Sequence, residues 1–290
     1  MRDVETQTVS AALLPVGKSG VSRVSTPDKR SWPSHVYVGI LVWVLIVPVG
    51  GIVLGSSTPA LAFSFETASI FFAVLAFFTA WHTYGYSRSS YLLFIGMTQL
   101  MVALLDSFSL ISSPVIRLST QLGILHCMQF WATARAIHAF CMFLAPKYAR
   151  LRRSSTRMLA SSALVAMSLV AAIMWLPGFP ELATADGALT SDMVVINYLI
   201  LGVLAVSVIG QTLSDVRDRL VRELMTASLA VAAVSQAAFI IAGPSLNYMT
   251  SGTGLFGHVA KALSYWLVYE AVFIGGYEHP LARLRDGLKH

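Results

Sequence analysis

The chain has 290 residues, of which 56% are hydrophobic and only 12% are charged, and its formal net charge is +6. A composition this apolar indicates a membrane protein with no soluble domain. Gly-rich phosphate loops, cysteine pairs with zinc spacing, and the HExxH and GxSxG motifs are all absent from the sequence, so we expect no enzymatic activity of this chain.

Eight strongly apolar stretches follow one another along the chain. They cover residues 37–55, 65–83, 91–112, 123–145, 157–176, 194–212, 223–243 and 254–275. Each is close to the ~20 residues that cross ~30 Å of hydrocarbon as a helix. Lipid offers no other partner for backbone N–H and C=O groups. We therefore predict an all-α, polytopic integral membrane protein with eight transmembrane helices.

The basic residues predict the orientation of these helices. Seventeen of the twenty Lys and Arg residues lie at the two chain ends or in alternate gaps between the stretches. The opposite loops carry only Arg117. By the positive-inside rule, both termini face the cytoplasm. Because topology accounts for the basic charge, no nucleic acid is expected as a partner.

The domain organisation follows from the same pattern. Residues 1–34 mix Ser, Thr, Pro, Lys and Arg without periodicity, which predicts a disordered cytoplasmic tail. Residues 35–280 form the membrane domain. Pro280 is expected to stop the eighth helix. Residues 281–290 are expected to form a short cytoplasmic tail without an output domain.

Polar side chains from five predicted helices fall at a similar depth in the outer half of the membrane. They are Asp106, His126, Gln129, Asn197, Gln236, His258 and Lys261. Such a belt is either a hydrogen-bond network that fixes helix packing or the wall of a pocket open to the outside. The sequence alone leaves both interpretations open.

The charged members of the belt carry the stronger argument for function. An unpaired ionised group at this depth costs roughly 3 kcal/mol or more, so Asp106 and Lys261 need partners and could neutralise one another. His258 and Lys261 are three residues apart and share a helix face with Tyr265. This face could hold a ligand or a proton relay, or a snorkelling lysine beside a hydrogen-bonded histidine.

Arg135 lies near the middle of the fourth stretch, and Trp131 and His138 share its helix face. A guanidinium at this depth needs a carboxylate, carbonyls or an aromatic face. Arg135 is therefore either an anchor paired with Asp106 or a contact for a ligand. His82 lies at the inner end of the second stretch, where its polar tip could simply be solvated.

Short motifs along the chain resemble those of a known family. They are WHTYGYSR at 81–88, YLLFIG at 91–96, LLD at 104–106, QFW at 129–131, AR at 134–135, LAP at 144–146, Gly187 with LT at 189–190, GH at 257–258, and Lys261, Ser264, Tyr269 and Pro280. In this order they resemble the signature of the MASE3 family of bacterial membrane-associated sensor domains. The resemblance covers nearly all of residues 35–283.

The resemblance implies a sensory input module of the bacterial inner membrane. Such a module detects a stimulus and passes a conformational change to a cytoplasmic output domain or partner, such as a histidine kinase or a diguanylate cyclase. A homodimer is also possible. The stimulus site would be lined by Asp106, Gln129, Arg135, Asn197, Gln236, His258 and Lys261, and the signal would leave through the eighth helix.

Two other functions are left open by the residues. One is a small-molecule transporter, which would require paired inverted repeats and broken helices. The other is a haem- or metal-binding membrane protein, for which His126 and His258 form the only histidine pair in the outer half. The identity of any ligand, cofactor or metal stays unknown at this point.

The chain departs from the family pattern at several polar positions. Ser107 to Leu110 replace a run that usually contains a histidine, His138 follows Arg135 where an acidic residue is usual, and Asn197 and Gln236 stand where the family usually has Glu. We therefore expect most carboxylates of the site to be lost. Such a site would suit a neutral or weakly anionic ligand better than a cation.

Overall fold

The computed structural model describes residues 32–42, 58–113, 123–151, 154–176, 179–184, 188–243 and 251–281. The predictions for most of the N-terminal tail, for the second half of the first span, for Gly187 and for residues 282–290 lie outside this part. The described long helices are α2 (Thr58–Ser87), α3 (Ser90–Ile111), α4 (Ile124–Tyr148), α5 (Ser155–Trp175), α6 (Ser191–Thr212), α7 (Arg219–Ala242) and α8 (Gly252–Phe273).

These helices correspond to the second through eighth predicted stretches, and most ends agree within a few residues. The largest difference is at α2, which begins at Thr58 rather than near residue 65. Within the described residues, five helices are long and apolar enough to cross a membrane, namely α2, α3, α5, α6 and α7. The less apolar α4 and α8 are not among them. The all-helical multi-pass architecture is confirmed, and the count of eight spans stays a prediction.

Side-chain caps explain where several helices begin. Ser89, Thr190, Asp218 and Ser251 each accept a hydrogen bond from the backbone N–H three residues ahead. A capping oxygen of this kind satisfies one of the N–H groups that the first helical turn leaves without an internal partner. The starts of α3, α6, α7 and α8 are therefore set locally by the sequence.

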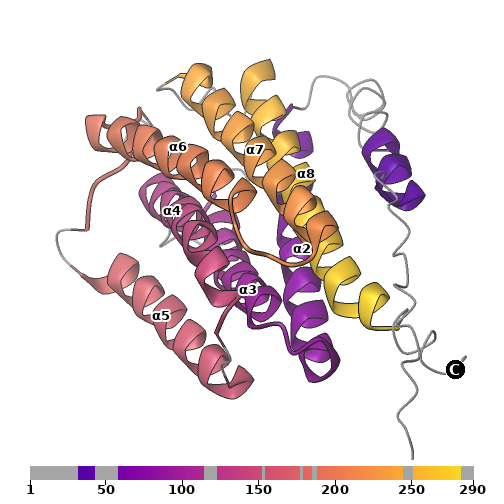
Figure 1. Cartoon of the computed structure of the whole chain (residues 1–290). Coiled ribbons are helices and arrows are strands. Elements are labelled where there is room, and N and C mark those ends of the chain that lie inside the picture. The colour runs from indigo at the N-terminus through magenta and orange to yellow at the C-terminus, as the bar shows by residue number, and fades with distance from the viewer. Residues whose placement is uncertain are drawn as a thin grey trace, which may run out of the picture.

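Six of the described helices pack in a closed ring (Figure 1). The order of neighbours around it is α2, α3, α4, α6, α7 and α8, and α8 returns to α2. Helices that are adjacent in sequence are neighbours in the ring except at α4 and α6, where the chain makes an excursion through α5. The ring encloses an interior to which every one of its helices can present a side chain.

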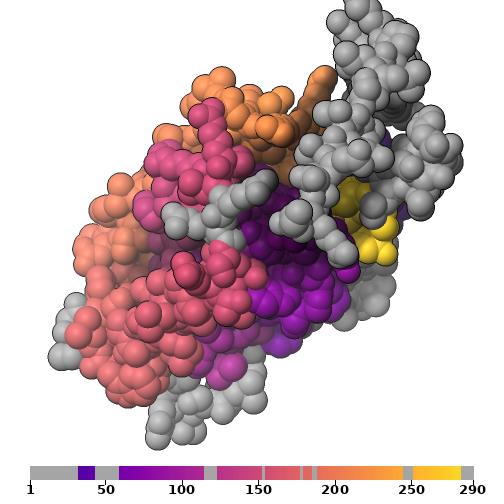
Figure 2. All heavy atoms as spheres, turned by 60° about the horizontal axis from the view of Figure 1, so that its bottom comes forward, coloured from indigo at the N-terminus to yellow at the C-terminus, as the bar shows by residue number. Residues whose placement is uncertain are grey.

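α5 lies outside the ring and packs mainly on α3. Figure 2 shows its side chains as a broad band on one face of the molecule. Of its most apolar window only 22% is buried, compared with 61% for α3. The large side chains of Leu164, Met167 and Trp175 are exposed on it. In a bilayer, these side chains would face lipid.

The hydrogen bonding of α8 changes shortly before Pro280. α8 continues into the π-helical segment η2 (Ile274–Glu278), and helical residues run on to Leu281. The N–H of His279 bonds to the carbonyl of Ile274, five residues back. Proline cannot donate a hydrogen bond, and it is accommodated here by a turn whose bonding is already widened. Because the residues after Leu281 lie outside the described part of the chain, the stop of the helix near Pro280 stays a prediction.

The described helical residues 34–42 pack against α8. Val36 is fully buried, and a Cβ on Gly39 would come within 2.2 Å of the Trp266 ring. The Nε2 atom of His35 lies 3.3 Å from the Glu270 carboxylate. The beginning of the first predicted span therefore lies close to the ring.

Candidate functional site

Every helix of the ring contributes at least one buried polar side chain to the interior. The set is Glu66 on α2, Asp106 on α3, Arg135 and His138 on α4, Asn197 on α6, Gln236 on α7, and His258, Lys261 and Tyr265 on α8. Each is at most 8% exposed. We call this set the ring cluster. Its members come from positions spread over 200 residues of sequence, and only the closed ring brings them together.

Four charges alternate in sign through the cluster. The Lys261 ammonium is bonded to the Glu66 carboxylate, and its Nζ lies 3.2 Å from Oδ2 of Asp106. The same Asp106 oxygen accepts a hydrogen bond of 2.6 Å from Nη2 of Arg135. We call the series Glu66, Lys261, Asp106 and Arg135 the ionic ladder. Two carboxylates balance two cations, which is the arrangement that buried charges in an apolar bundle require.

His258 extends the ladder at the Glu66 end. Its Nδ1 lies 2.6 Å from Oε1 of Glu66, so both oxygens of that carboxylate are engaged by α8. The His258 ring also meets Phe239 edge-on at 4.9 Å, and Phe239 meets Trp131 at 5.2 Å. Aromatic packing from α4 and α7 thus holds the imidazole in place.

Tyr265 forms an aromatic wall at the other end. The Arg135 guanidinium lies 5.2 Å from the centre of its ring, and Lys261 Nζ lies 5.9 Å from it. The His138 imidazole stacks on the same ring at 5.2 Å with an interplanar angle of 3°. A tyrosine face stabilises cations at such distances, so Tyr265 supports both basic members of the ladder.

A small cavity of about 20 Å³ lies beside the ladder. Its walls are formed by Arg135, His138, Ile200, Leu204, Ala232, Ser235, Gln236, Lys261, Ser264 and Tyr265. The two ring nitrogens of His138 have no hydrogen-bond partner in the described part of the chain. The cavity volume suits about one water molecule. The ring interior is therefore a packed polar core in this structure and has no room for an organic ligand.

The structure brings together four of the seven predicted sensing residues: Asp106, Arg135, His258 and Lys261. The proposed pairing of Arg135 with Asp106 is confirmed, as is the proximity of Asp106 and Lys261. His258 and Lys261 share a face as predicted, and both reach the same carboxylate. Of the secondary residues, Tyr265 contacts the ladder directly, and His138 stacks on Tyr265.

The remaining predicted residues lie apart from the ladder. Asn197 and Gln236 bond to one another across α6 and α7 at 2.8 Å. Gln129 donates instead to the carbonyl of Pro180, at 2.9 Å. His82 is exposed and stacks on Phe78, and His126 is half-buried. Trp131 approaches the ladder only through Phe239.

Glu66 is the residue that the sequence analysis missed. The second stretch was expected to begin near residue 65, which would leave Glu66 at the membrane surface. Because α2 begins at Thr58, Glu66 lies two turns inside the helix and is 8% exposed. The loss of family carboxylates at the positions of Asn197 and Gln236 stays a prediction, and the ladder has a second carboxylate, Glu66, at a position that the prediction did not consider. A single acid in an otherwise apolar 30-residue helix was the available signal.

Within the described ranges, no group of three or more His, Cys, Asp or Glu side chains could hold a metal ion. The two carboxylates of the ring cluster are each already bound to a cationic side chain. The ion pairs of this arrangement hold several helices together. A small displacement of one helix would separate the paired charges.

Comparison with protein families finds one match. The model of MASE3, described as a membrane-associated sensor domain, matches residues 57–280. This range runs from the start of α2 to the helical end beyond η2, and so includes every residue of the ring cluster. Comparisons with curated proteins and with solved structures found no match.

Proposed function

The chain belongs to the MASE3 family of membrane-associated sensor domains, and on that premise we propose that it is a non-catalytic sensory input module whose stimulus acts on the ionic ladder. The membrane domain over residues 35–280 would detect the stimulus from the outer half of the bilayer. It would then relay a conformational change to a cytoplasmic output domain or partner protein. By its family and its basic loops, it would work in a bacterial inner membrane.

The position of Lys261 is the observation that carries this proposal. Lys261 is 1% exposed and belongs to α8, yet its ammonium is held by carboxylates of α2 and α3. Separating any of these pairs would leave a charge in a low-dielectric interior, at a cost of about 3–5 kcal/mol. A shift of α8 or the entry of water would therefore occur before such an unpaired charge formed. The ladder can therefore couple a small chemical change to the position of one helix.

The route from the ladder to the predicted cytoplasmic end runs along α8. Eight residues beyond Tyr265, α8 passes into η2. There a Cβ on Gly276 would lie 2.5 Å from Oγ1 of Thr83 on α2. Such close packing leaves little room for α8 to shift without a change at this contact. π-helical turns of this kind are often found at functional positions.

The size of the cavity limits the stimulus. A space of about 20 Å³ admits a water molecule, so a larger ligand must separate ring helices in order to enter. A small polar ligand that competes for Glu66 or Asp106 would do this by replacing one rung of the ladder. Gln129, Asn197 and Gln236 would then belong to the outer wall of the widened site.

The proposal is tested by hydrogen exchange at the far end of α8. Glu66→Gln removes the carboxylate that holds Lys261 and His258. Glu223→Gln is the matched control because Glu223 bonds only with Arg219 on the surface of α7 and has the same change in charge. Both variants of the full chain are compared with wild type in lipid nanodiscs by mass spectrometry of peptides over 274–281.

We expect faster exchange over 274–281 in Glu66→Gln and wild-type exchange in Glu223→Gln. Glu66→Asp, which shortens the side chain but keeps the charge, should give an intermediate result and guards against misfolding of the first variant. Identical exchange in all four proteins would refute the relay through α8. Co-purification with a signalling partner would then identify the output.

A further inference from the structure

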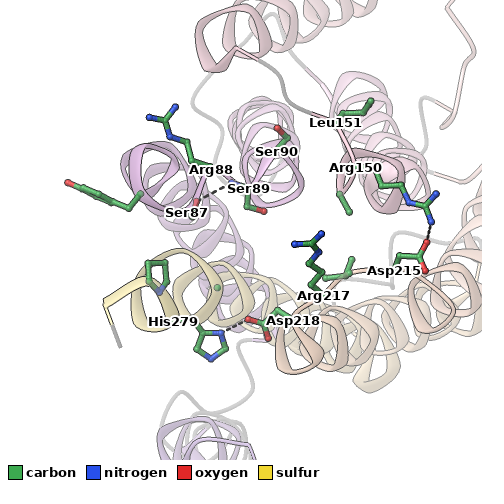
Figure 3. Close-up of a pocket in the computed structure, with 15 residues that line it drawn as sticks. Ser87, Arg88, Ser89, Ser90, Arg150, Leu151, Asp215, Arg217, Asp218 and His279 are labelled. Carbon is green, nitrogen blue, oxygen red and sulfur yellow. Dashed lines mark hydrogen bonds and ion pairs between the residues drawn. The ribbon is translucent and has the colours of Figure 1, made fainter. Parts of the chain in front are cut away.

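A large hollow opens at the end of the bundle opposite the ladder. Its volume is about 1120 Å³, and Figure 3 shows its walls. It lies between the α2–α3 corner, the end of α4, the loop from α6 to α7 and the end of η2. Its walls include Arg88, Arg150, Asp215, Arg217, Asp218 and His279. We call it the basic hollow.

The carboxylates of the basic hollow are already engaged by other groups. Asp215 is bonded to Arg150, and Asp218 is bonded to His279. Arg217 lies between these two acids in sequence but forms no ion pair with any described residue. In Figure 3 its guanidinium points into the hollow, toward the corner formed by Ser89 and Ser90.

A second cation stands at the rim. Arg88 connects α2 to α3 in a left-handed backbone conformation with a φ of 50°, and its Nε donates to the carbonyl of Gly85 at 3.1 Å. Its terminal nitrogens are directed to the outside of the hollow in Figure 3. The hollow is lined by three arginines, Arg88, Arg150 and Arg217, and by only two acids, so it has a surplus of positive charge.

We propose that the basic hollow binds a phosphate-bearing anion, with Arg217 as its principal contact and Arg88 as a contact at the rim. A guanidinium matches phosphate oxygens in a bidentate manner, and the hydroxyls of Ser87 and Ser89 add donors on the facing wall. The volume exceeds what one phosphate needs and suits a substituted phosphate of small-molecule size.

Two sources share this chemistry. The hollow lies where the transmembrane helices end, on the side that the basic loops predict to be cytoplasmic, and basic pockets there can hold the headgroups of anionic lipids. A soluble phosphate compound of the cytoplasm could also enter. His279 and Pro280 line the hollow, so either ligand would contact the segment by which the chain leaves α8 and η2.

The test uses the full chain in nanodiscs of neutral phosphatidylcholine. Thermal unfolding is measured as phosphatidylglycerol is added to the lipid, and separately as inorganic phosphate or glycerol 3-phosphate is added to the buffer. The variants are Arg217→Gln and Arg88→Gln. Arg157→Gln is the matched control, because Arg157 is exposed near the start of α5 at the same end of the bundle and does not line the hollow.

We expect wild type and Arg157→Gln to be stabilised equally by the anion, and Arg217→Gln to need about tenfold more of it for the same shift. Arg88→Gln should show a smaller loss. A response to phosphatidylglycerol alone identifies a lipid headgroup, and a response to both probes identifies a soluble phosphate as a ligand. If Arg217→Gln and Arg157→Gln respond alike to every probe, the site does not exist.

This inference is independent of the ladder. No member of the ionic ladder lines the basic hollow, so a sensor that fails the hydrogen-exchange test could still bind phosphate there. Arg217 is exposed, and its replacement should leave the unfolding temperature in pure phosphatidylcholine unchanged.

Discussion

The ring cluster and the basic hollow are both rich in charge, but they differ in how that charge is balanced. In the ring cluster, every ladder charge has an opposite partner and the adjoining cavity measures about 20 Å³. In the basic hollow, the space is about 1120 Å³ and Arg217 has no carboxylate partner in the described structure. One region is closed by its own side chains, and the other is open to a ligand.

This difference indicates two separate uses of charge. Separating the ion pairs in the apolar ring interior costs much free energy. These pairs are therefore suited to stabilise one helix arrangement against another. Charges in a wide, water-accessible hollow interact weakly with their neighbours and are suited to exchange ligands. A stimulus at the ladder should therefore change conformation, whereas an anion at the hollow should adjust how the end of α8 responds.

The largest effect should come from removing the central cation of the ladder. Lys261→Met leaves Glu66 and Asp106 buried with only Arg135 as a nearby cation. We expect a loss of about 3–5 kcal/mol in the free energy of unfolding, measured by titration with sodium dodecyl sulfate in mixed micelles.

The control for this change is Lys147→Met. Lys147 is an exposed residue in the last turn of α4, and its replacement should cost under about 0.5 kcal/mol. Combining Glu66→Gln with Lys261→Met removes one charge of each sign and should recover part of the loss. If the two lysine variants were equally stable, the ladder would have no energetic role.

The next largest effect should come from the contact between η2 and α2. Gly276→Ala would place a Cβ 2.5 Å from Thr83 Oγ1 and 3.2 Å from Thr83 Cβ. Overpacking of this kind typically costs 1–3 kcal/mol, so we expect about 2 kcal/mol. The same unfolding titration measures it.

Gly202→Ala provides the contrast, since a Cβ at Gly202 on α6 would meet nothing within 4 Å. Alanine is the better helix former, so this variant should be neutral or stabilising by up to about 1 kcal/mol. If Gly276→Ala and Gly202→Ala were equally stable, η2 could move away from α2 without any loss in the free energy of unfolding.

The fold could be predicted well because its signals are local. Length and hydropathy located the seven long helices that the structure describes. Capping residues such as Asp218 and Ser251, which the prediction did not use, set the starts observed for α7 and α8. The closed ring could not be predicted, because the pairing of α4 with α6 and of α8 with α2 depends on contacts distant in sequence. The π-helical segment η2 could not be predicted either, because its shift in hydrogen bonding has no clear sequence signal.

The ladder was predicted in part. Asp106, Arg135 and Lys261 are conspicuous because charges in apolar helices demand partners. Glu66 was missed because the position of a helix start decides whether an acidic residue near it is buried or solvated. α2 begins seven residues earlier than predicted. His126 was predicted at the depth of the ladder residues, but its side chain is only half-buried. The depth of a side chain in the membrane can be counted along the sequence. Whether that side chain points into the ring depends on how the helices pack.

A smaller effect is expected where α7 meets the end of η2. Asp218 caps α7 through the N–H of Val221 at 3.2 Å and also bonds to His279. Asp218→Ala removes both interactions and should cost about 1 kcal/mol. Asp218→Asn keeps an amide oxygen for the cap and loses only the charged pair, so it should cost less. Unfolding titrations of both variants separate the two contributions.

The contribution of this carboxylate should depend on pH. Burial alone would raise the pKa of Asp218, but the bond to His279 and the backbone N–H of Val221 outweigh it and lower the pKa below its ordinary value of 3.8. A lowered pKa in the folded state means that the ionised form stabilises the fold above about pH 4. The stability difference between wild type and Asp218→Asn should therefore shrink as the pH falls below about 4.

The smallest effect should come from the neutral pair of the ring cluster. Asn197 accepts a hydrogen bond from Gln236 at 2.8 Å, and both side chains are buried. Hydrogen bonds between transmembrane helices are worth about 0.6 kcal/mol on average. Replacing both residues by Leu should therefore change the free energy of unfolding by less than about 1 kcal/mol, in contrast to Lys261→Met. A loss as large as that of Lys261→Met would show that the amides are part of the ladder's electrostatic network, and the division of the ring cluster into a charged and a neutral half would have to be abandoned.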